Sequence, residues 1–202
     1  MASGADRTAR AEGPPAAGQY VRPTALRGVF LVERPVLADA RGFFHEVERR
    51  TDLAPLVAEV PRHAQWNHSR SRRGVLRGIH VATWSKCVYV VRGRAQIVLV
   101  DARPDEPTFG HHLSLVLGER RRAALWLPPG VGNSFLALSA WVDFMYSVDA
   151  EWYPEGEFGI AWDDPDLAIP WQIDRPLLSE RDQHNPTLRQ RFPDRFPGAG
   201  RP

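Results

Sequence analysis

The chain has 202 residues, of which 43% are hydrophobic and 25% are charged. These proportions are ordinary for one globular domain with a core of its own, and they exclude a collagen-like or wholly disordered protein. The 26 Lys and Arg residues stand against 24 Asp and Glu residues, and the cations are spread along the chain. We therefore expect no nucleic-acid partner.

No apolar run approaches the length of a membrane span, and the N-terminus lacks the hydrophobic region of a signal peptide. A cytoplasmic protein without a membrane partner is predicted. The single cysteine, Cys87, excludes a disulfide framework and a Cys-based zinc site within one chain. In its strand-like surroundings it is expected to be a small buried hydrophobe.

The two ends of the chain differ from the middle in composition. Residues 1–19 are small, polar and rich in Pro and Gly, which predicts a disordered leader. Residues 192–202 have the same character and predict a flexible tail. The sequence thus indicates a single domain over residues 20–191.

Ordered structure is expected to begin near Leu26, with a strand, a turn and a second strand over residues 28–38. A further turn is expected at residues 39–42. Residues 51–60 are the best helix candidate, with Thr51 and Asp52 in N-cap positions, and Pro55 permits only a short helix.

From Ala64 onward, short β-type runs alternate with turns every 8–12 residues. Two strands are expected around Gly93, and in the second of them Ala95, Ile97 and Leu99 share one face. Further strands are expected at residues 112–117, 123–128, 134–139 and 142–149. Residues 160–190 predict loops with a short C-terminal helix. This pattern favours an all-β protein, either an antiparallel sandwich or a barrel, with one or two short helices.

His80 is the residue around which chemistry is expected. It lies three positions after Arg77 and six before Lys86, in a stretch that alternates polar and apolar residues as a half-buried strand does. A histidine held on rigid β structure beside two cations suits proton transfer on an anionic substrate. Spacing alone leaves open a second interpretation, in which His80 is a satisfied core histidine.

Metal binding is not predicted at His80. A second histidine two places on and a carboxylate a few residues later are both missing, and Lys86 stands where the carboxylate would be needed. Two other candidates stay ambiguous on the residues alone. The carboxylates of WDDP (162–165) serve either as a turn cap or in catalysis, and Tyr146 is either a site residue or a core aromatic.

Seven motifs occur in an order that resembles the dTDP-4-dehydrorhamnose 3,5-epimerase family, over roughly residues 26–190. They are Gln65-x-Asn67-x-Ser69-x-Ser71, GVLRGIH (74–80), VDARPDEPTFG (100–110), LWLPPG (125–130), Tyr146 with Tyr153-Pro154, GIAWDDPDLAIPW (159–171) and LSERDQHNPTL (178–188). The resemblance implies a cupin-type jelly-roll β-barrel, a homodimer, and neither a metal nor an organic cofactor. It also implies a dTDP-linked 4-keto-6-deoxyhexose as substrate, epimerised beside its ketone through an enolate.

By motif match, the resemblance makes His80 the base, Asp164 the carboxylate that orients it, and Tyr146 the acid on the opposite face of the sugar. Lys86 matches a lysine near the developing oxyanion, and Arg77 an arginine that contacts substrate. The other expected binding residues are Gln65 and Asn67, which line the pocket, and Arg41, Phe44 and Glu46, which act partly across the dimer.

Two positions and the length of one spacer depart from the family pattern. Asn133 stands where a second histidine is usual, and Trp152 stands where another aromatic, often tyrosine, is expected near the base or the phosphates. The spacer between His80 and Lys86 (residues 81–85) is shorter than in the family. Whether carbon 3, carbon 5 or both are epimerised is therefore left open. The alternatives are a 3,4-ketoisomerase on the same barrel and a non-catalytic nucleotide-sugar-binding member of the fold.

Overall fold

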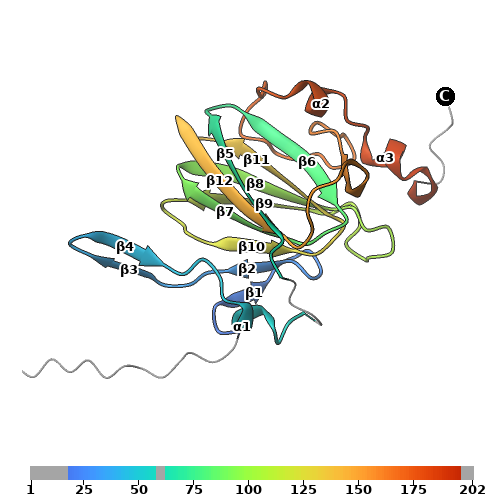
Figure 1. The fold of residues 1–202 in the computed structure, drawn as a ribbon. Coiled ribbons are helices and arrows are strands. Elements are labelled where there is room, and N and C mark those ends of the chain that lie inside the picture. The colour runs from blue at the N-terminus through green and yellow to red at the C-terminus, as the bar shows by residue number, and fades with distance from the viewer. Residues whose placement is uncertain (1–17, 58–61, 197–202) are drawn as a thin grey trace, which may run out of the picture.

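The computed structural model describes residues 18–57 and 62–196, which form two facing antiparallel sheets and one projecting hairpin (Figure 1). The six-stranded sheet has the order β1 (Val21–Pro23), β2 (Phe30–Val32), β10 (Ala124–Leu127), β7 (Lys86–Arg92), β12 (Trp141–Val148), β5 (Gln65–Arg72). The five-stranded sheet has the order β13 (Glu157–Gly159), β6 (Leu76–Ala82), β11 (Val131–Ala137), β8 (Arg94–Asp101), β9 (His112–Gly118). This double-sheet arrangement confirms the predicted all-β jelly-roll class, although the two sheets are not closed into one continuous barrel.

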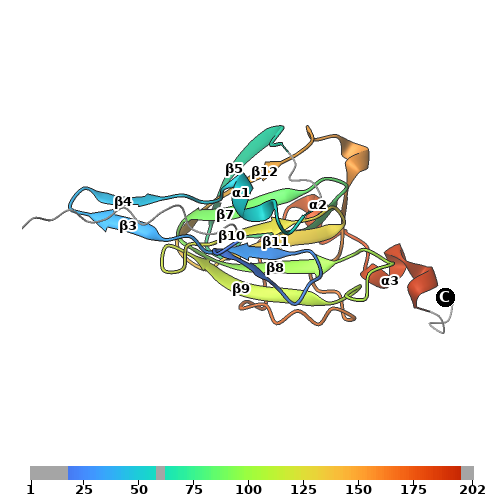
Figure 2. The ribbon, with the colours of Figure 1, turned by 90° about the horizontal axis from the view of Figure 1, so that it is seen from below.

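The main core lies between the two sheets and consists of aliphatic and aromatic side chains from both. Strand β8 alternates as predicted, with Ala95, Ile97 and Leu99 in the main core. Its other face is buried too, because Val98 and Val100 pack in a second cluster with residues of the C-terminal segment. The C-terminal segment thus covers the outer face of the five-stranded sheet, and helix α3 (Leu188–Arg191) lies at one end of the molecule (Figure 2).

The helices are all short. They are α1 (Arg50–Leu53), α2 (Glu180–Gln183), α3 (Leu188–Arg191) and the 3-10 turns η1 (Pro154–Gly156) and η2 (Pro193–Arg195). Within residues 18–57 and 62–196 no helix has the length and apolar character needed to cross a membrane.

The helix predicted at residues 51–60 is wrong in its start and its cap. Helix α1 begins at Arg50, Arg49 provides no side-chain cap, and Asp52 lies inside the helix. The Asp52 carboxylate instead pairs with the buried guanidinium of Arg34, a tertiary contact that local sequence does not reveal. Residues 58–61 lie outside the described part.

The predictions for the chain ends need correction where the structure describes them. Ordered structure begins before Leu26, because β1 pairs with β2 and the Tyr20 ring lies 4.6 Å from the guanidinium carbon of Arg34. The tail prediction is wrong for residues 192–196, since Phe192 and Phe196 pack against Phe109. Residues 1–17 and 197–202 lie outside the described residues.

A two-stranded hairpin, β3 (Val36–Asp39) and β4 (Gly42–His45), extends away from the two sheets (Figure 1). Its apolar side chains are largely uncovered, with Leu37 63% and Phe44 62% exposed. Large apolar side chains on a projecting hairpin are typical of a surface that contacts another molecule.

Candidate active site

A cavity of about 130 Å³ opens between the two sheets. It is lined by Ser69, Arg77, His80, Lys86, Asn133, Phe135, Phe144, Tyr146 and Glu157. Five of these, on four different strands, are residues that the sequence predicted for the site. The structure therefore brings together the central part of the predicted set.

A second cavity of about 460 Å³ lies beside the first and shares Arg77 and His80 with it. Its lining adds two further guanidinium groups, those of Arg72 and Arg181. Guanidinium groups bind phosphate oxygens through paired hydrogen bonds, so the larger cavity suits a phosphorylated portion of a ligand.

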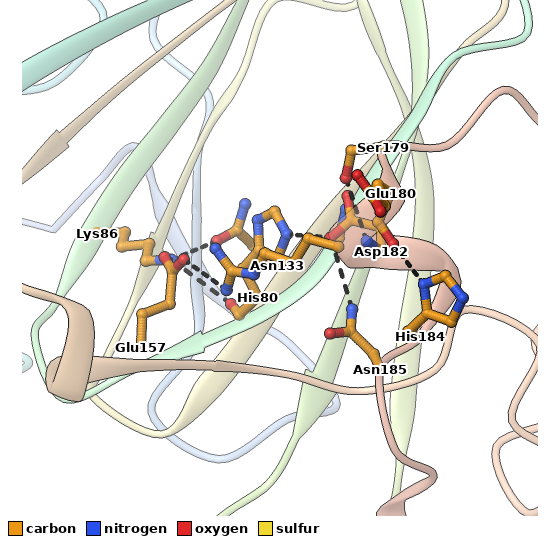
Figure 3. A network of polar contacts seen from close by, with 11 residues as sticks. His80, Lys86, Asn133, Glu157, Ser179, Glu180, Asp182, His184 and Asn185 are labelled. Carbon is orange, nitrogen blue, oxygen red and sulfur yellow. Dashed lines mark hydrogen bonds and ion pairs between the residues drawn. The ribbon is translucent and has the colours of Figure 1, made fainter.

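The imidazole of His80 has a buried carboxylate partner. Its Nε2 atom lies 2.8 Å from Oδ1 of Asp182, whose side chain is only 4% exposed (Figure 3). The second oxygen of Asp182 accepts a hydrogen bond from the backbone N–H of Gly78 at 3.3 Å. Burial alone would raise the pKa of Asp182, but the hydrogen bond and charge of His80, with the Gly78 N–H, lower it below its usual value. The carboxylate is therefore ionised beside His80.

Helix α2 fixes the position of this carboxylate. Ser179 caps the helix, and its Oγ accepts a hydrogen bond from the backbone N–H of Asp182 at 3.1 Å. Three residues further on, the side-chain amide of Asn185 also reaches Asp182 Oδ1, at 3.5 Å. Helix α2 thus holds the Asp182 carboxylate beside His80 of β6.

Asp164, which was expected to orient His80, does something else, and that assignment is wrong. Its Oδ1 accepts hydrogen bonds from the backbone N–H groups of Asp166 and Leu167, and its Oδ2 from that of Leu188. Backbone N–H groups of a turn and of the first residue of α3 thus occupy both oxygens of the Asp164 carboxylate. Of the two interpretations of the WDDP motif, the turn cap holds.

Lys86 lines the cavity, and its side chain is only 4% exposed. Its Nζ donates a hydrogen bond to Asn133 Oδ1 at 2.8 Å and lies 3.6 Å from Glu157 Oε2. Burial penalises the ammonium and lowers the Lys86 pKa to about 8, although the nearby Glu157 carboxylate acts in the opposite direction. At neutral pH the group remains a cation inside a poorly solvated site.

Tyr146 faces the cavity from the other sheet. It lies on β12 between β7 and β5, whereas His80 lies on β6 of the five-stranded sheet. Burial and the negative charge of Glu157 raise the Tyr146 pKa, so the phenol stays protonated at neutral pH. An imidazole and a protonated phenol therefore line the same cavity from opposite sheets.

The inward face of β5 is polar. Gln65 donates from Nε2 to Asn67 Oδ1 at 2.7 Å, and Ser71 Oγ accepts from Arg77 Nε at 3.0 Å. Gln65 also accepts a hydrogen bond from the backbone N–H of Trp152. Trp152 as a residue is 53% exposed and does not line the cavity around His80.

The three remaining predicted residues, Arg41, Phe44 and Glu46, lie on or beside the projecting hairpin. Arg41 pairs with Asp39, and Glu46 pairs with arginines near the hairpin base, Arg34 and Arg49. Arg41 and Phe44 line a separate surface hollow of about 520 Å³. Within one chain the structure does not bring these three residues to His80.

Two carboxylates that contact His80 or Lys86 escaped prediction. Asp182 lies in LSERDQHNPTL (178–188), a segment that carried the resemblance without a role for its carboxylate. Glu157 comes from the short strand β13, which has no periodic signal, so only the fold reveals its contact with Lys86. In the described part of the chain, no three His, Cys, Asp or Glu side chains gather as a group that could hold a metal ion.

Comparison with known proteins gives consistent matches over most of the chain. Residues 23–190 match the family model described as dTDP-4-dehydrorhamnose 3,5-epimerase. The enzyme of that name from Pseudomonas aeruginosa is 38% identical over 163 residues, covering 79% of this chain and 90% of the relative. A dTDP-4-dehydrorhamnose 3-epimerase from Streptomyces niveus is 36% identical over 167 residues, covering 81% of each.

Two solved structures are also similar. One is a dTDP-6-deoxy-D-glucose-3,5-epimerase from Legionella pneumophila in complex with dTDP-4-keto-L-rhamnose, with TM-score 0.80 and 33% identity, covering 87% of this chain and 95% of that one. The other is a 4-keto-6-deoxy sugar epimerase from the novobiocin biosynthetic gene cluster of Streptomyces spheroides, with TM-score 0.82 and 34% identity, covering 91% and 94%.

Proposed function

Because the chain belongs to the dTDP-4-dehydrorhamnose 3,5-epimerase family, we propose that it epimerises a dTDP-linked 4-keto-6-deoxyhexose in deoxysugar biosynthesis. The reaction inverts carbon 3, carbon 5 or both, the two carbons that flank the C4 ketone. One observation carries the proposal: His80, paired with Asp182, and Tyr146 line one cavity from opposite sheets.

In the first step, His80 removes a proton from the carbon beside the ketone. Its Nε2 is held by the ionised Asp182, which leaves Nδ1 as the nitrogen that accepts the proton. The negative carboxylate stabilises the imidazolium that forms and fixes the ring orientation. Asp182 is therefore a positioning residue for the base.

The electron pair of the broken C–H bond moves into the ring and leaves an enolate with negative charge on the former ketone oxygen. Lys86 supplies a buried positive charge in the same cavity. A cation in a site of low dielectric constant stabilises a developing oxyanion far more than it would in water. We assign this role to Lys86.

In the last step the enolate collapses, and Tyr146 donates the phenolic proton to the same carbon from the opposite face. The raised pKa of Tyr146 keeps that proton available at neutral pH. A base and an acid on opposite faces of the sugar invert the carbon, whereas one group acting alone would return the original isomer.

The diphosphate of the substrate is assigned to the larger cavity, because Arg77 joins it to the cavity around His80. Arg72 and Arg181 add positive charge there. Gln65 and Asn67, on the polar face of β5, are assigned to the pocket wall, and Trp152 to its outer rim. Together the two cavities have the size range of ordinary small-molecule sites.

The active unit is proposed to be a homodimer. The hairpin that carries Arg41 and Phe44 reaches away from the two sheets (Figure 1). Its apolar side chains are largely exposed. A partner chain would cover these side chains and receive Arg41, Phe44 and Glu46 at its site. We expect a cytoplasmic enzyme without a cofactor, a membrane partner or a nucleic-acid partner.

Epimerisation of carbon 3 alone is a second candidate, supported by relatives of that kind at similar identity. A dTDP-4-dehydro-6-deoxyglucose 3-epimerase from a Streptomyces species is 35% identical over 176 residues, close to the values for the 3,5-epimerases. The short 81–85 spacer leads directly to Lys86, and Asn133 accepts a hydrogen bond from its ammonium, so both departures from the family pattern lie beside the residue assigned to the ketone oxygen.

The test is proton exchange followed by NMR in heavy water with dTDP-4-keto-6-deoxyglucose. Loss of the signal of the proton on carbon 3, carbon 5 or both identifies the epimerised positions. His80→Asn should abolish exchange, and His112→Asn, on β9, is the matched control that should leave it unchanged. Movement of the keto group would establish the 3,4-ketoisomerase instead. Binding without exchange in the unaltered protein would establish a non-catalytic nucleotide-sugar-binding protein.

A further inference from the structure

The sequence contains one lysine. Of its 26 Lys and Arg residues, 25 are arginines, and the remaining one is Lys86. An ammonium is a compact cation with three N–H donors, whereas a guanidinium is a larger planar fork. The chain thus uses an ammonium at a single position, and that position is buried in the candidate active site.

Groups from several elements surround the Lys86 ammonium. Strand β6 presents the backbone oxygen of His80 at 3.5 Å, and β13 presents Glu157 Oε2 at 3.6 Å. Arg181 of α2 acts on the ammonium as a like charge, and Tyr146 of β12 and Arg77 of β6 line the same cavity. The polar atom closest to Nζ belongs to none of these groups.

That closest atom is Oδ1 of Asn133, at 2.8 Å (Figure 3). Asn133 lies on β11 directly opposite His80 of β6 and is only 8% exposed. Its neutral oxygen stabilises the ammonium by a hydrogen bond without cancelling its charge. The amide therefore links β11, the strand paired with that of His80, to the Lys86 ammonium.

We propose that Asn133 is a positioning residue whose Oδ1 orients the Lys86 ammonium beside His80 and keeps it charged during the reaction. This inference rests on the proposed epimerase function, in which Lys86 stabilises the enolate. An alkyl group at position 133 would leave a buried ammonium without its shortest contact. A carboxylate there would hold the ammonium but neutralise it.

The single lysine makes a direct test possible. Protein grown with lysine labelled with ¹³C and ¹⁵N has one labelled side chain, so its Cε and Nζ signals report Lys86 alone. The titration midpoint is measured in the unaltered protein, Asn133→Ala and Asn133→Asp. Gln172→Glu, an exposed amide whose replacement adds the same charge away from Lys86, is the matched control.

We expect the midpoint to fall by about one pH unit in Asn133→Ala, because a hydrogen bond that favoured the charged form is lost. It should rise by at least about one unit in Asn133→Asp, because the new carboxylate favours the ammonium. Gln172→Glu should leave it unchanged. The Asp variant is nearly isosteric, so it carries the test if the Ala variant does not fold.

Turnover provides the second measurement. In Asn133→Ala, kcat should fall about tenfold or more with little change in KM, and the alkaline limb of its pH profile should move down with the NMR midpoint. In Asn133→Asp, kcat should also fall, while the alkaline limb moves up. A purely structural role for Asn133 would lower the yield of folded protein without moving either limb.

An NMR midpoint that is the same in all four proteins would overturn the inference. So would a shifted midpoint with unchanged kcat in both Asn133 variants. A failure of the proposed function has a different signature: the unaltered protein would show no proton exchange from the sugar. Shifted midpoints would then still establish the contact of Asn133 with Lys86, and the missing exchange would contradict the epimerase assignment alone.

Discussion

The Nε2 atom of His80 lies 2.8 Å from Oδ1 of Asp182, although 102 positions separate the two residues in the sequence. The pair joins β6 to α2, and both residues line the larger cavity, while His80 also lines the smaller one. Because Asp182 also accepts from the Gly78 backbone, its carboxylate has one orientation relative to the ring. This geometry separates the role of Asp182 from that of Asp164, the carboxylate that the sequence predicted for His80.

Asp182→Asn should lower kcat by about 10² to 10⁴ and change KM little, because a neutral amide neither fixes the tautomer of His80 nor stabilises its cation. Asp164→Asn should instead lower the free energy of unfolding by about 2 kcal/mol, since it weakens three hydrogen bonds to backbone N–H groups. Its kcat per folded molecule should be retained. Steady-state kinetics and urea unfolding measure the two effects, and the opposite outcome would restore Asp164 as the partner of His80.

The lowered pKa of Lys86 predicts that turnover falls and the free energy of unfolding rises as the solution becomes alkaline. Its folded-state pKa of about 8 lies below the usual 10.5, so between these values the unfolded chain binds more protons than the folded one. The free energy of unfolding should therefore rise as pH increases from 8 to 10.5, by about 3 kcal/mol at most. Turnover should fall over the same range, because the ammonium that stabilises the enolate is lost.

Lys86→Met is the control for this pair of effects. It should have very low turnover at every pH and should lack the alkaline rise in stability. The difference between urea unfolding of the two proteins at pH 7.5 and at pH 10 isolates Lys86 from the tyrosines and Cys87, which they share. Equal pH dependence in the two proteins would contradict a depressed Lys86 pKa.

The projecting hairpin predicts a coupling between assembly and substrate affinity. Phe44→Glu places a charge on an apolar side chain that is 62% exposed in one chain, so the folded monomer should tolerate it while a dimer interface should not. We expect sedimentation to show a monomer and KM to rise at least about tenfold. Trp141→Glu, at a half-exposed aromatic outside the hairpin, should remain dimeric. If both variants sediment like the unaltered protein, the hairpin is not the dimer contact.

The sequence was informative where one local pattern decides the structure. Alternation along residues 94–101 predicted which side chains of β8 face the main core, and the motif match placed His80, Lys86 and Tyr146 on strands that meet at one cavity. Prediction from the sequence failed where a contact between residues far apart in the chain determines the structure. Asp52 sits in a position that resembles an N-cap, but the buried Arg34 takes its carboxylate.

The assignment of Asp164 as the partner of His80 failed for the same reason, because Asp182 takes that place. Both carboxylates lie in motifs near the C-terminus, and both are almost fully buried. Only the path of the chain shows that Asp164 faces the start of α3, whereas Asp182 faces β6. Glu157 could not be predicted either, because a three-residue strand has too few positions to show a period.

Tyr146→Phe should separate proton removal from inversion. The ring and its packing against Phe144 remain, but the phenolic proton that must reach the second face of the sugar is absent. His80 still removes the proton and returns one from solvent to the same face, so deuterium should enter the sugar with its configuration retained. NMR in heavy water reads exchange and configuration in one sample.

The rate of exchange in Tyr146→Phe should stay within about tenfold of the unaltered protein, while the rate of inversion falls by about 10² or more. Inversion at an unchanged rate would exclude Tyr146 as the acid, and loss of exchange together with inversion would make the phenol part of the proton-removal step.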